Sequence, residues 1–467
     1  MPVEDVSPPG WRRARSNDWA SNPKYIELQE ELRSGFSTIT SGITSLASSP
    51  TAASGGLSIS RSRVQSVDQG YDFTRVAIPK SRLCMYLSHW HTECAPLLDK
   101  FDEAQHFGVH LPVAARKSPA LFYALLAFSA RHYERTFCPG DIDDTLELYQ
   151  ESIRLLVPAL QTGDDNVLGA ACILACLELM SNGSHDWRRH AQGCASLFLH
   201  FNVNGFSTGL QQAIFWCYAR MDLCGAIMSY GANSTVLPLD YWVPAAGFGI
   251  VSQDDYVRTL FAHRGSESPD MYANWVVYLC AQACDFLHRQ TQYLEMGRLD
   301  DRDREPFDKQ WVWLWEELQH WYLHRPPAIH PIYECSATGS ECFPEILFTH
   351  WAAISSTQLY HTACLILIDT RVDACVPDFP PSSGQPFTIA RWHARRICGI
   401  SMANPHPASL VNAVQPLYVA GRLMTHPEEH LAVARLLKHI ETMTGWSAIW
   451  RLADLEREWG YEPGEIS

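Results

Sequence analysis

The segment SPALFYALLAFSARHYER, residues 118–135, decides the fold class of this 467-residue chain. It opens with Ser-Pro, which is typical of a helix N-terminus because the first helical position leaves its backbone N–H unpaired. Leu121, Leu125 and Phe128 then recur at i, i+4 and i+7 and so line one face of a helix. The segment therefore predicts an α-helix that buries an apolar face in a core.

The same helical period continues outward from this segment through most of the chain. Pro- and Gly-bearing loops near 231–255, 325–342 and 371–387 interrupt it, and no stretch alternates long enough to build a sheet. The pattern predicts an all-α fold of about a dozen helices. We expect these helices over residues 142–160, 166–180, 187–201, 210–228, 271–294, 307–323, 343–369, 389–402, 410–424, 428–443 and 446–459.

The N-terminal part has a different composition. Ser, Thr and Gly dominate residues 34–66, and such a segment cannot bury enough apolar surface to offset the entropy of ordering it. We therefore expect two parts: a disordered tail and linker over residues 1–79, and an all-helical domain over residues 80–467.

The composition excludes several classes of protein. Hydrophobic residues make up 46% of the chain, which supplies a sizeable core and excludes global disorder. The formal net charge of −15 argues against binding nucleic acid through the chain's own phosphate contacts, because these need clustered Lys and Arg. The longest apolar runs are far shorter than a membrane span. We expect a soluble intracellular protein that makes no membrane contact.

The 15 cysteines predict neither a metal site nor disulfides. None of them forms a Cys-x-x-Cys pair, and no secretory signal precedes them. Cys172 and Cys176 are four residues apart in an apolar run, as are Cys280 and Cys284, so each pair shares one helical face. We interpret them as small hydrophobic residues and expect no metal or cofactor.

One motif suggests an enzyme. Gly-Phe-Ser-Thr-Gly at 205–209 matches the nucleophile elbow of α/β-hydrolases, with Ser207 as nucleophile. That elbow needs a strand before the serine, whereas a helical pattern precedes it here. A capping box of Thr208 and Gln211 at the start of the next helix explains the residues better. A hydrolase that uses Ser207 is therefore the alternative, and we expect no catalytic residues.

Two further clusters have ordinary structural interpretations. His89-Trp-His-Thr-Glu93 carries three metal-capable side chains, but residues two apart do not share a helical face. Trp311 and Trp315 lie at i and i+4 on one face of a predicted helix, which favours core packing over an aromatic ligand box.

The C-terminal segment carries an apolar stripe. Its members recur at i, i+3, i+4 and i+7: Trp446, Ile449, Trp450 and Ala453. Because an exposed stripe of this kind favours aggregation, we expect it to close the core, with partner docking as the alternative.

Several helical strings resemble the large regulatory domain of fungal zinc-cluster transcription factors, in the branch of the arginine-metabolism and acetamidase-type regulators. The likeness covers roughly residues 80–460. The strings occur in the family's order: 120–135, 149–160 with 167–178, 189–195, 215–222, 396–399, 414–422, 445–446 and 455–459.

The resemblance assigns eight residues to the family's motifs: His190, Gly193, Trp216, Arg220, Asp222, Gly421, Arg422 and Trp446. Arg220 and Asp222 lie among apolar residues, so we expect them to pair with neighbouring charges. Gly193 and Gly421 lie inside helical patterns, where glycine costs about 1 kcal/mol relative to alanine. A neighbouring helix that approaches closely would explain each of these glycines.

One departure from the family affects function. The family's DNA-binding module needs six Cys near the N-terminus to hold two zinc ions, whereas the first cysteine here is Cys84. Three explanations fit this departure: a truncated gene prediction, a fragment of a longer protein, and a natural regulator that works through partners.

The resemblance implies a regulator of RNA polymerase II transcription in a fungus. The genes that it regulates would belong to a metabolic or biosynthetic pathway. It implies action in the nucleus, with shuttling to the cytoplasm as an option. The implied partners are the transcription machinery or another DNA-binding regulator, with DNA contacted only indirectly. A small-molecule effector and a homodimer fit the same resemblance, and a cytosolic helical scaffold is the further alternative.

Overall fold

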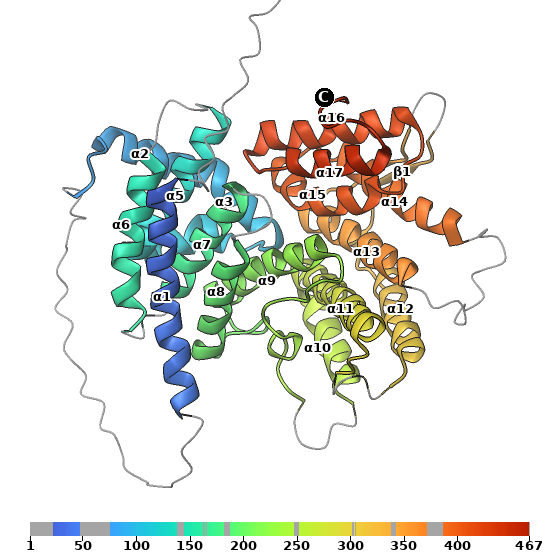
Figure 1. Ribbon diagram of the computed structural model, residues 1–467, viewed down its shortest axis with the longest axis horizontal. Coiled ribbons are helices and arrows are strands. Elements are labelled where there is room, and N and C mark those ends of the chain that lie inside the picture. The colour runs from blue at the N-terminus through green and yellow to red at the C-terminus, as the bar shows by residue number, and fades with distance from the viewer. Residues whose placement is uncertain are drawn as a thin grey trace, which may run out of the picture.

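The computed structural model describes residues 22–46, 75–137, 144–161, 164, 166–181, 187–246, 252–300, 303, 305–337, 342–370 and 386–466. Within these ranges the chain consists of helices and loops, apart from one antiparallel ribbon of β1 (Tyr333–Cys335) and β2 (Glu345–Leu347). Figure 1 shows the chain running from the blue N-terminal helices through the green centre to the red C-terminal helices. The all-α fold class is confirmed.

The N-terminal part is a bundle around α5 (Pro119–Thr136), which the segment 118–135 predicts. This helix is buried on every side from Ala120 to Arg131, rather than on one face. The reason is that helices surround it, as expected for an element that is apolar all round. Its neighbours are α2 (Lys80–His89), α6 (Asp144–Ala159) and α7 (Asn166–Ser181), and α8 (Trp187–Phe201) packs against α7.

A chain of short elements connects α2 to α5 and shapes the cavities described below. The π-helix η3 (Trp90–Cys94) continues α2, and α3 (Ala95–Leu98) and the 3₁₀ turn η4 (Asp99–Phe101) follow it. After a tight turn the chain forms the π-helix η5 (His106–His110) and α4 (Leu111–Ala115). Gln105 in that turn has a φ of 53°, in the left-handed region. A residue other than glycine adopts this conformation here because the chain reverses sharply.

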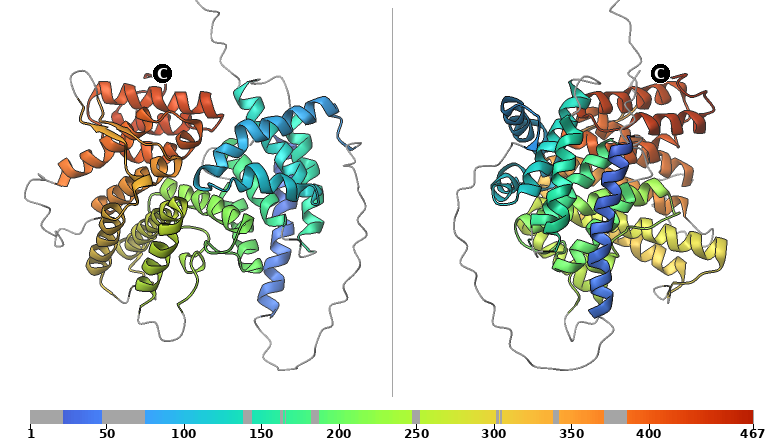
Figure 2. Two further views of the ribbon diagram at one scale, coloured as in Figure 1. Left: turned by 180° about the vertical axis from the view of Figure 1, so that it is seen from behind. Right: turned by 60° about the vertical axis from the view of Figure 1, so that its left-hand side comes forward.

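The expected disordered tail over residues 1–79 is corrected in one stretch, because Pro23–Leu46 forms α1. Figure 2 shows this dark blue helix lying along the bundle, where it packs against α6 and α8. Its buried side chains recur about every third or fourth residue: Tyr25, Leu28, Leu32 and Phe36. The Ser/Thr-rich composition that begins at residue 34 obscured this period. The rest of the expected linker, residues 47–66, lies outside the described residues.

The central and C-terminal parts continue from α9, which joins them to the bundle. Their helices pack in sequence and return toward α3 and α5. They are α9 (Leu210–Ser229), η6 (Leu239–Tyr241), α10 (Gln253–Glu267), α11 (Pro269–Met296), α12 (Phe307–Leu323), η7 (Pro327–Ile329), α13 (Trp351–Asp369), α14 (Pro386–Ala403), α15 (Pro407–Gly421), α16 (Pro427–Thr444) and α17 (Ile449–Trp459).

Two elements differ from the expected helices. Residues 343–350 do not start the expected helix over 343–369, because β2 pairs with β1 there and α13 begins only at Trp351. The helix α10 occupies residues just beyond the loop expected near 231–255, and the Ser252 hydroxyl accepts a hydrogen bond from the backbone N–H of Asp255 at its start. None of the helices in the described part of the chain is both long and apolar enough to cross a membrane.

The expected stripe on the last helix is wrong in register. Trp446 is buried but precedes α17, and Ile449 is half exposed, whereas Leu452 and Leu455 are the buried apolar residues of α17. Since α17 packs against α15 and α16 through that other face, it does close the core as expected. The Trp311–Trp315 pair is a stacked core pair, and the Trp311 indole donates to the Leu367 carbonyl.

Candidate functional site

Two polar cavities formed by the described residues border the turn 102–105, close to α9 and α11. The first has a volume of about 400 Å³. Arg220, on α9, lines this cavity together with an acidic wall formed by Asp102 and Asp270. Trp216 lies one helical turn before Arg220 and faces the same cavity.

Arg220 is buried at this cavity and forms no direct ion pair among the described residues, and the Asp102 carboxylate acts on it only through a longer-range electrostatic interaction. Its guanidinium lies over the Phe101 ring, 4.6 Å from the centroid. Its hydrogen bonds are long: 3.5 Å to Asn274 Oδ1 and 3.4 Å to the Leu98 carbonyl. Burial lowers the pKa of Arg220, but a guanidinium stays charged in proteins. Most of its five N–H donors are therefore available to an acceptor in the cavity.

The acidic wall is held by backbone contacts. Asp102 accepts hydrogen bonds from the backbone N–H of His106, at 2.7 Å, and from the His106 ring nitrogen Nδ1, at 2.8 Å. Asp270, in the first turn of α11, accepts from the backbone N–H of Glu103 at 2.6 Å. Burial raises the pKa of Asp270, so this carboxyl takes up a proton more readily than an exposed one. The turn thus links α11 to the bundle through carboxylates.

A second cavity, of about 470 Å³, lies on the other side of the same turn. It shares Asp102 and Asp270 with the first cavity and adds His350, from the residue before α13. Asp99 lines it and accepts hydrogen bonds from the backbone N–H groups of Phe107 and Gly108, both at 2.8 Å. Burial outweighs these bonds and raises the pKa of Asp99 to about 7.

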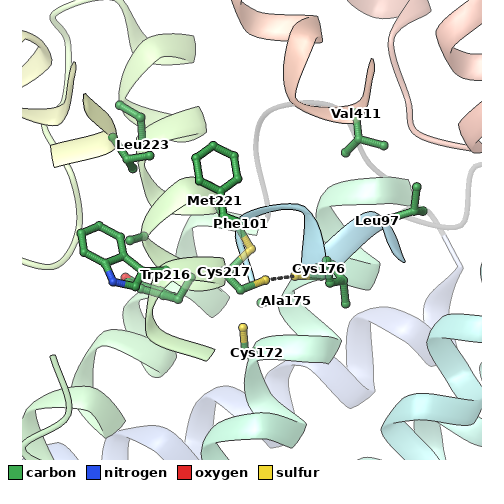
Figure 3. Close-up of a cluster of buried hydrophobic side chains, with 14 of the residues drawn as sticks. Leu97, Phe101, Cys172, Ala175, Cys176, Trp216, Cys217, Met221, Leu223 and Val411 are labelled. Atoms are coloured by element: carbon green, nitrogen blue, oxygen red, sulfur yellow. Dashed lines mark hydrogen bonds between the residues drawn. The ribbon is translucent and has the colours of Figure 1, made fainter. Parts of the chain in front are cut away.

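A third, small cavity of about 40 Å³ connects this region to the core. Lys100, Arg220 and Trp446 line it together with the thiols of Cys176 and Cys217. Figure 3 shows those two sulfurs, from α7 and α9, pointing toward each other. Lys100 is buried, and desolvation together with the nearby Arg220 charge lowers the pKa of its amine to about 7.

Of the eight residues that the family motifs predict, three meet at these cavities: Trp216, Arg220 and Trp446. Trp216 donates its indole N–H to the Gly205 carbonyl at 2.8 Å. The other five lie in structural positions elsewhere. The cavities therefore bring together residues that are more than 200 positions apart in the sequence.

Asp222 is held mainly by backbone donors, and the charge of Arg188 acts on it only electrostatically, without a direct ion pair among the described residues. Its carboxylate accepts hydrogen bonds from the backbone N–H groups of Val236, at 2.7 Å, and Leu237, at 2.9 Å. The Tyr218 hydroxyl is its third donor, at 3.3 Å. Burial raises the pKa of Asp222 to about 6 in spite of these bonds. Asp222 therefore anchors the loop after α9, and Arg220 is left to face the cavity.

His190 belongs to a buried network under α1. Its Nδ1 lies 2.8 Å from a carboxylate oxygen of Glu178, and the Tyr149 hydroxyl donates to the same oxygen at 2.6 Å. Burial disfavours the charged ring, but the Glu178 carboxylate and a hydrogen bond with Cys194 outweigh it and raise the pKa of His190 to about 10. The Phe36 ring of α1 covers the imidazole edge-on.

Each of the two helical glycines has a neighbouring helix against it, as the sequence predicts. A β-carbon at Gly193 would overlap with the Phe36 ring, and one at Gly421 would lie 2.8 Å from a methyl carbon of Leu455. Arg422 follows Gly421 and places its guanidinium 4.4 Å from the centre of the Tyr230 ring.

The two motifs that suggested chemistry have structural roles. The Ser207 hydroxyl accepts a hydrogen bond from the backbone N–H of Asn204 within a turn, and among the described residues no hydrogen bond from this hydroxyl to a catalytic base is seen. The expected Thr208 cap is wrong, because α9 starts at Leu210 with Gly209 as its N-cap. His89 is buried against His132, at 2.8 Å between ring nitrogens.

Sequence reasoning missed Lys100, Asp102 and Asp270 as residues of the site. Each is an ordinary charged residue near a helix end, where a solvated position is the usual interpretation. The sequence offers one signal: Lys100 has apolar residues close to it, with Leu98 two positions before it and Phe101 directly after it.

Comparison with known proteins agrees with this architecture. The family model described as "Fungal specific transcription factor domain" matches residues 85–455, and the chain therefore belongs to this family. The chain is also similar to the "Transcription activator AMTR1" of Alternaria alternata, with 23% identity over 356 residues, 63% of this chain and 44% of that protein. The chain thus matches less than half the length of this relative. No solved structure matches the chain.

Proposed function

We propose that this chain regulates transcription by RNA polymerase II in a fungus, and that a small effector bound in the Arg220 cavity controls its output. Family membership supports the regulatory role, and the activator named among its relatives supports activation as the direction. The chain acts in the nucleus and contacts DNA indirectly, through another DNA-binding regulator or module. The transcription machinery is its other partner.

The observation that carries the effector site is the unpaired charge of Arg220. A buried guanidinium without a carboxylate is costly, and an anionic ligand offsets that cost. The cavity of about 400 Å³ has the size of a small-molecule site. Asp102 and Asp270 of the acidic wall would accept hydrogen bonds from a ligand amine or hydroxyl. The site therefore fits a small polar molecule that carries a carboxylate or phosphate.

The site also offers a mechanism for control. The turn 102–105 contacts α11 through Asp270, and Arg220 on α9 faces that turn. A ligand that joins Arg220 to the acidic wall holds α9, α11 and the turn in one arrangement. A ligand that binds one arrangement of a regulatory domain more tightly than another shifts the population toward the arrangement that it prefers.

The test combines binding and output. The full chain is screened by thermal shift against a library of small carboxylates and phosphate esters, and the same chain fused to a heterologous DNA-binding domain drives a reporter in yeast. We expect Arg220→Met to abolish both the thermal shift and the effector response, while Arg457→Met, an exposed arginine of α17, changes neither. A wild-type response in Arg220→Met would contradict this site.

A further inference from the structure

Three buried thiols meet between two helices of the core. Cys172 and Cys176 are one turn apart on α7, and Cys217 faces them from α9. Their sulfur atoms all lie within 4.8 Å of one another, and Sγ of Cys176 is 3.8 Å from Sγ of Cys217. Figure 3 shows the three sulfurs converging on one point between the helices.

The spacing fits a metal ion at the centre of the three sulfurs. A three-coordinate ion with metal–sulfur bonds of about 2.3 Å places its ligands about 4 Å apart. The Cys176–Cys217 separation already meets this value, and Cys172 needs only a small side-chain adjustment. All three residues lie on rigid, packed helices, which preorganises the ligands.

The number and type of ligands select the ion. Among the described residues, no fourth His, Cys or carboxylate joins this group of donors. Structural zinc is almost always four-coordinate, whereas soft thiolate ligands also select Cu(I). A trio of thiolates without an oxygen or nitrogen ligand therefore favours Cu(I).

Charge balance favours the same ion. Three thiolates and one Cu(I) carry a net charge of −2. Lys100 and Arg220 are both buried beside the cluster and interact electrostatically with Cys217, and in their charged forms together they supply +2. A divalent ion would leave a net positive charge in the core, where an uncompensated charge is costly.

The small cavity provides space next to the cluster. Cys176 and Cys217 both line its volume of about 40 Å³, as do Lys100 and Arg220. Cys224 lines the same cavity from one face of α9 but lies outside the trio. A thiol that lines the same cavity, although it is less buried than the trio, is therefore available as a control.

We propose that Cys172, Cys176 and Cys217 bind one Cu(I) ion as a three-coordinate thiolate site in the core, with Lys100 and Arg220 as its counter-charges. Binding releases the protons of the thiols that are not already ionised, without any change in the oxidation state of sulfur or copper. Arg220 lines both this small cavity and the larger effector cavity, whereas none of the three cysteine ligands lines the larger one.

The test is a titration of the purified full chain with Cu(I) in the absence of oxygen, in competition with the chromogenic chelator bicinchoninate. We expect one Cu(I) per chain and an X-ray absorption spectrum with three sulfur ligands. Cys176→Ser and Cys217→Ser each weaken binding by more than about 100-fold, because a lost ligand costs more than a lost outer-shell contact. Cys224→Ser and the double variant Cys280→Ser/Cys284→Ser leave the affinity unchanged.

Folding is controlled separately. Because a serine hydroxyl in the core destabilises the bundle, Cys176→Ala and Cys217→Ala are measured as well, with far-UV circular dichroism of every variant. Copper affinity lost in a folded alanine variant supports the site. Copper that stays bound in the folded variants, no binding at one equivalent, or zinc that displaces Cu(I) from the wild-type chain would each overturn it. None of these results depends on the response of Arg220 to an effector.

Discussion

The ring of Phe36 lies directly against the backbone of Gly193, so that at this point the Phe36 side chain alone separates α1 from the backbone of α8. The ring also covers the His190 imidazole, with centroids 5.6 Å apart. A helix from the N-terminal region therefore covers a buried charged network of the domain. The matched family region starts at residue 85, well after this helix.

Gly193→Ala should destabilise the protein by about 1–3 kcal/mol, because the added methyl forces α1 away from α8. Chemical denaturation measures this difference. In the background of Phe36→Ala the same substitution should cost little, because the ring that it meets is gone. An equal cost in both backgrounds would show that the overlap with Phe36 is not the cause.

His190→Ala should cost about 3–5 kcal/mol, because it leaves the buried Glu178 carboxylate without its charged partner. The pKa of His190 is raised in the folded state, from 6.5 to about 10. Its contribution is therefore fully present below about pH 6.5 and is lost as the pH rises through about 10. The difference between the denaturation midpoints of wild type and His190→Ala should shrink across that window, while the exposed His200→Ala serves as the control.

Trp446→Ala should cost about 3–5 kcal/mol and should lower the melting temperature strongly, because the indole is buried near Phe128. Trp450→Ala should cost clearly less. Its ring is only partly buried, with the Arg451 guanidinium 4.2 Å from its centre. Thermal melting of the two variants side by side checks the order. If Trp450→Ala lowered the melting temperature more than Trp446→Ala, the apolar stripe predicted from the sequence would be the buried face of the last helix.

Asp222→Ala should cost about 2–3 kcal/mol, because two backbone N–H groups of the following loop lose their acceptor. Ser207→Ala should cost less than about 1 kcal/mol, since it removes one hydrogen bond in a partly buried turn. Both are measured by denaturation, and the reporter output of Ser207→Ala should equal that of wild type. A reporter that fails in folded Ser207→Ala would revive the enzyme alternative.

The helical period in the sequence was sufficient for the fold class and for most helices, because burial of one face repeats every three to four residues. It located 187–201 and 307–323 to the residue. It missed α1, because the Ser- and Thr-rich half of that helix hides the four apolar residues that anchor it. Register failed for α17, where aromatic residues suggested the wrong face.

The site was less accessible from the sequence. Arg220 and Trp446 could be singled out through their family strings, but nothing in the sequence places them at one cavity. Lys100 and the thiol of Cys217 come to that cavity only through the packing of α9 on α7 and of α15 on α3. Such long-range neighbours depend on the tertiary arrangement, which a local pattern does not encode.

The contact between α5 and the end of α16 has a consequence for how the protein is made. The Arg135 side chain donates to the carbonyl of Gly445, 310 residues later, and the backbone N–H of Ser447 donates to the carbonyl of Met180. At about 5–20 residues per second, a ribosome needs roughly 15–60 s to synthesise the intervening chain. Throughout that interval the newly made N-terminal bundle exposes the surface that Trp446 later covers. Nascent chains at this stage should be clients of chaperones, and translational pausing between α5 and α16 should lengthen their dependence.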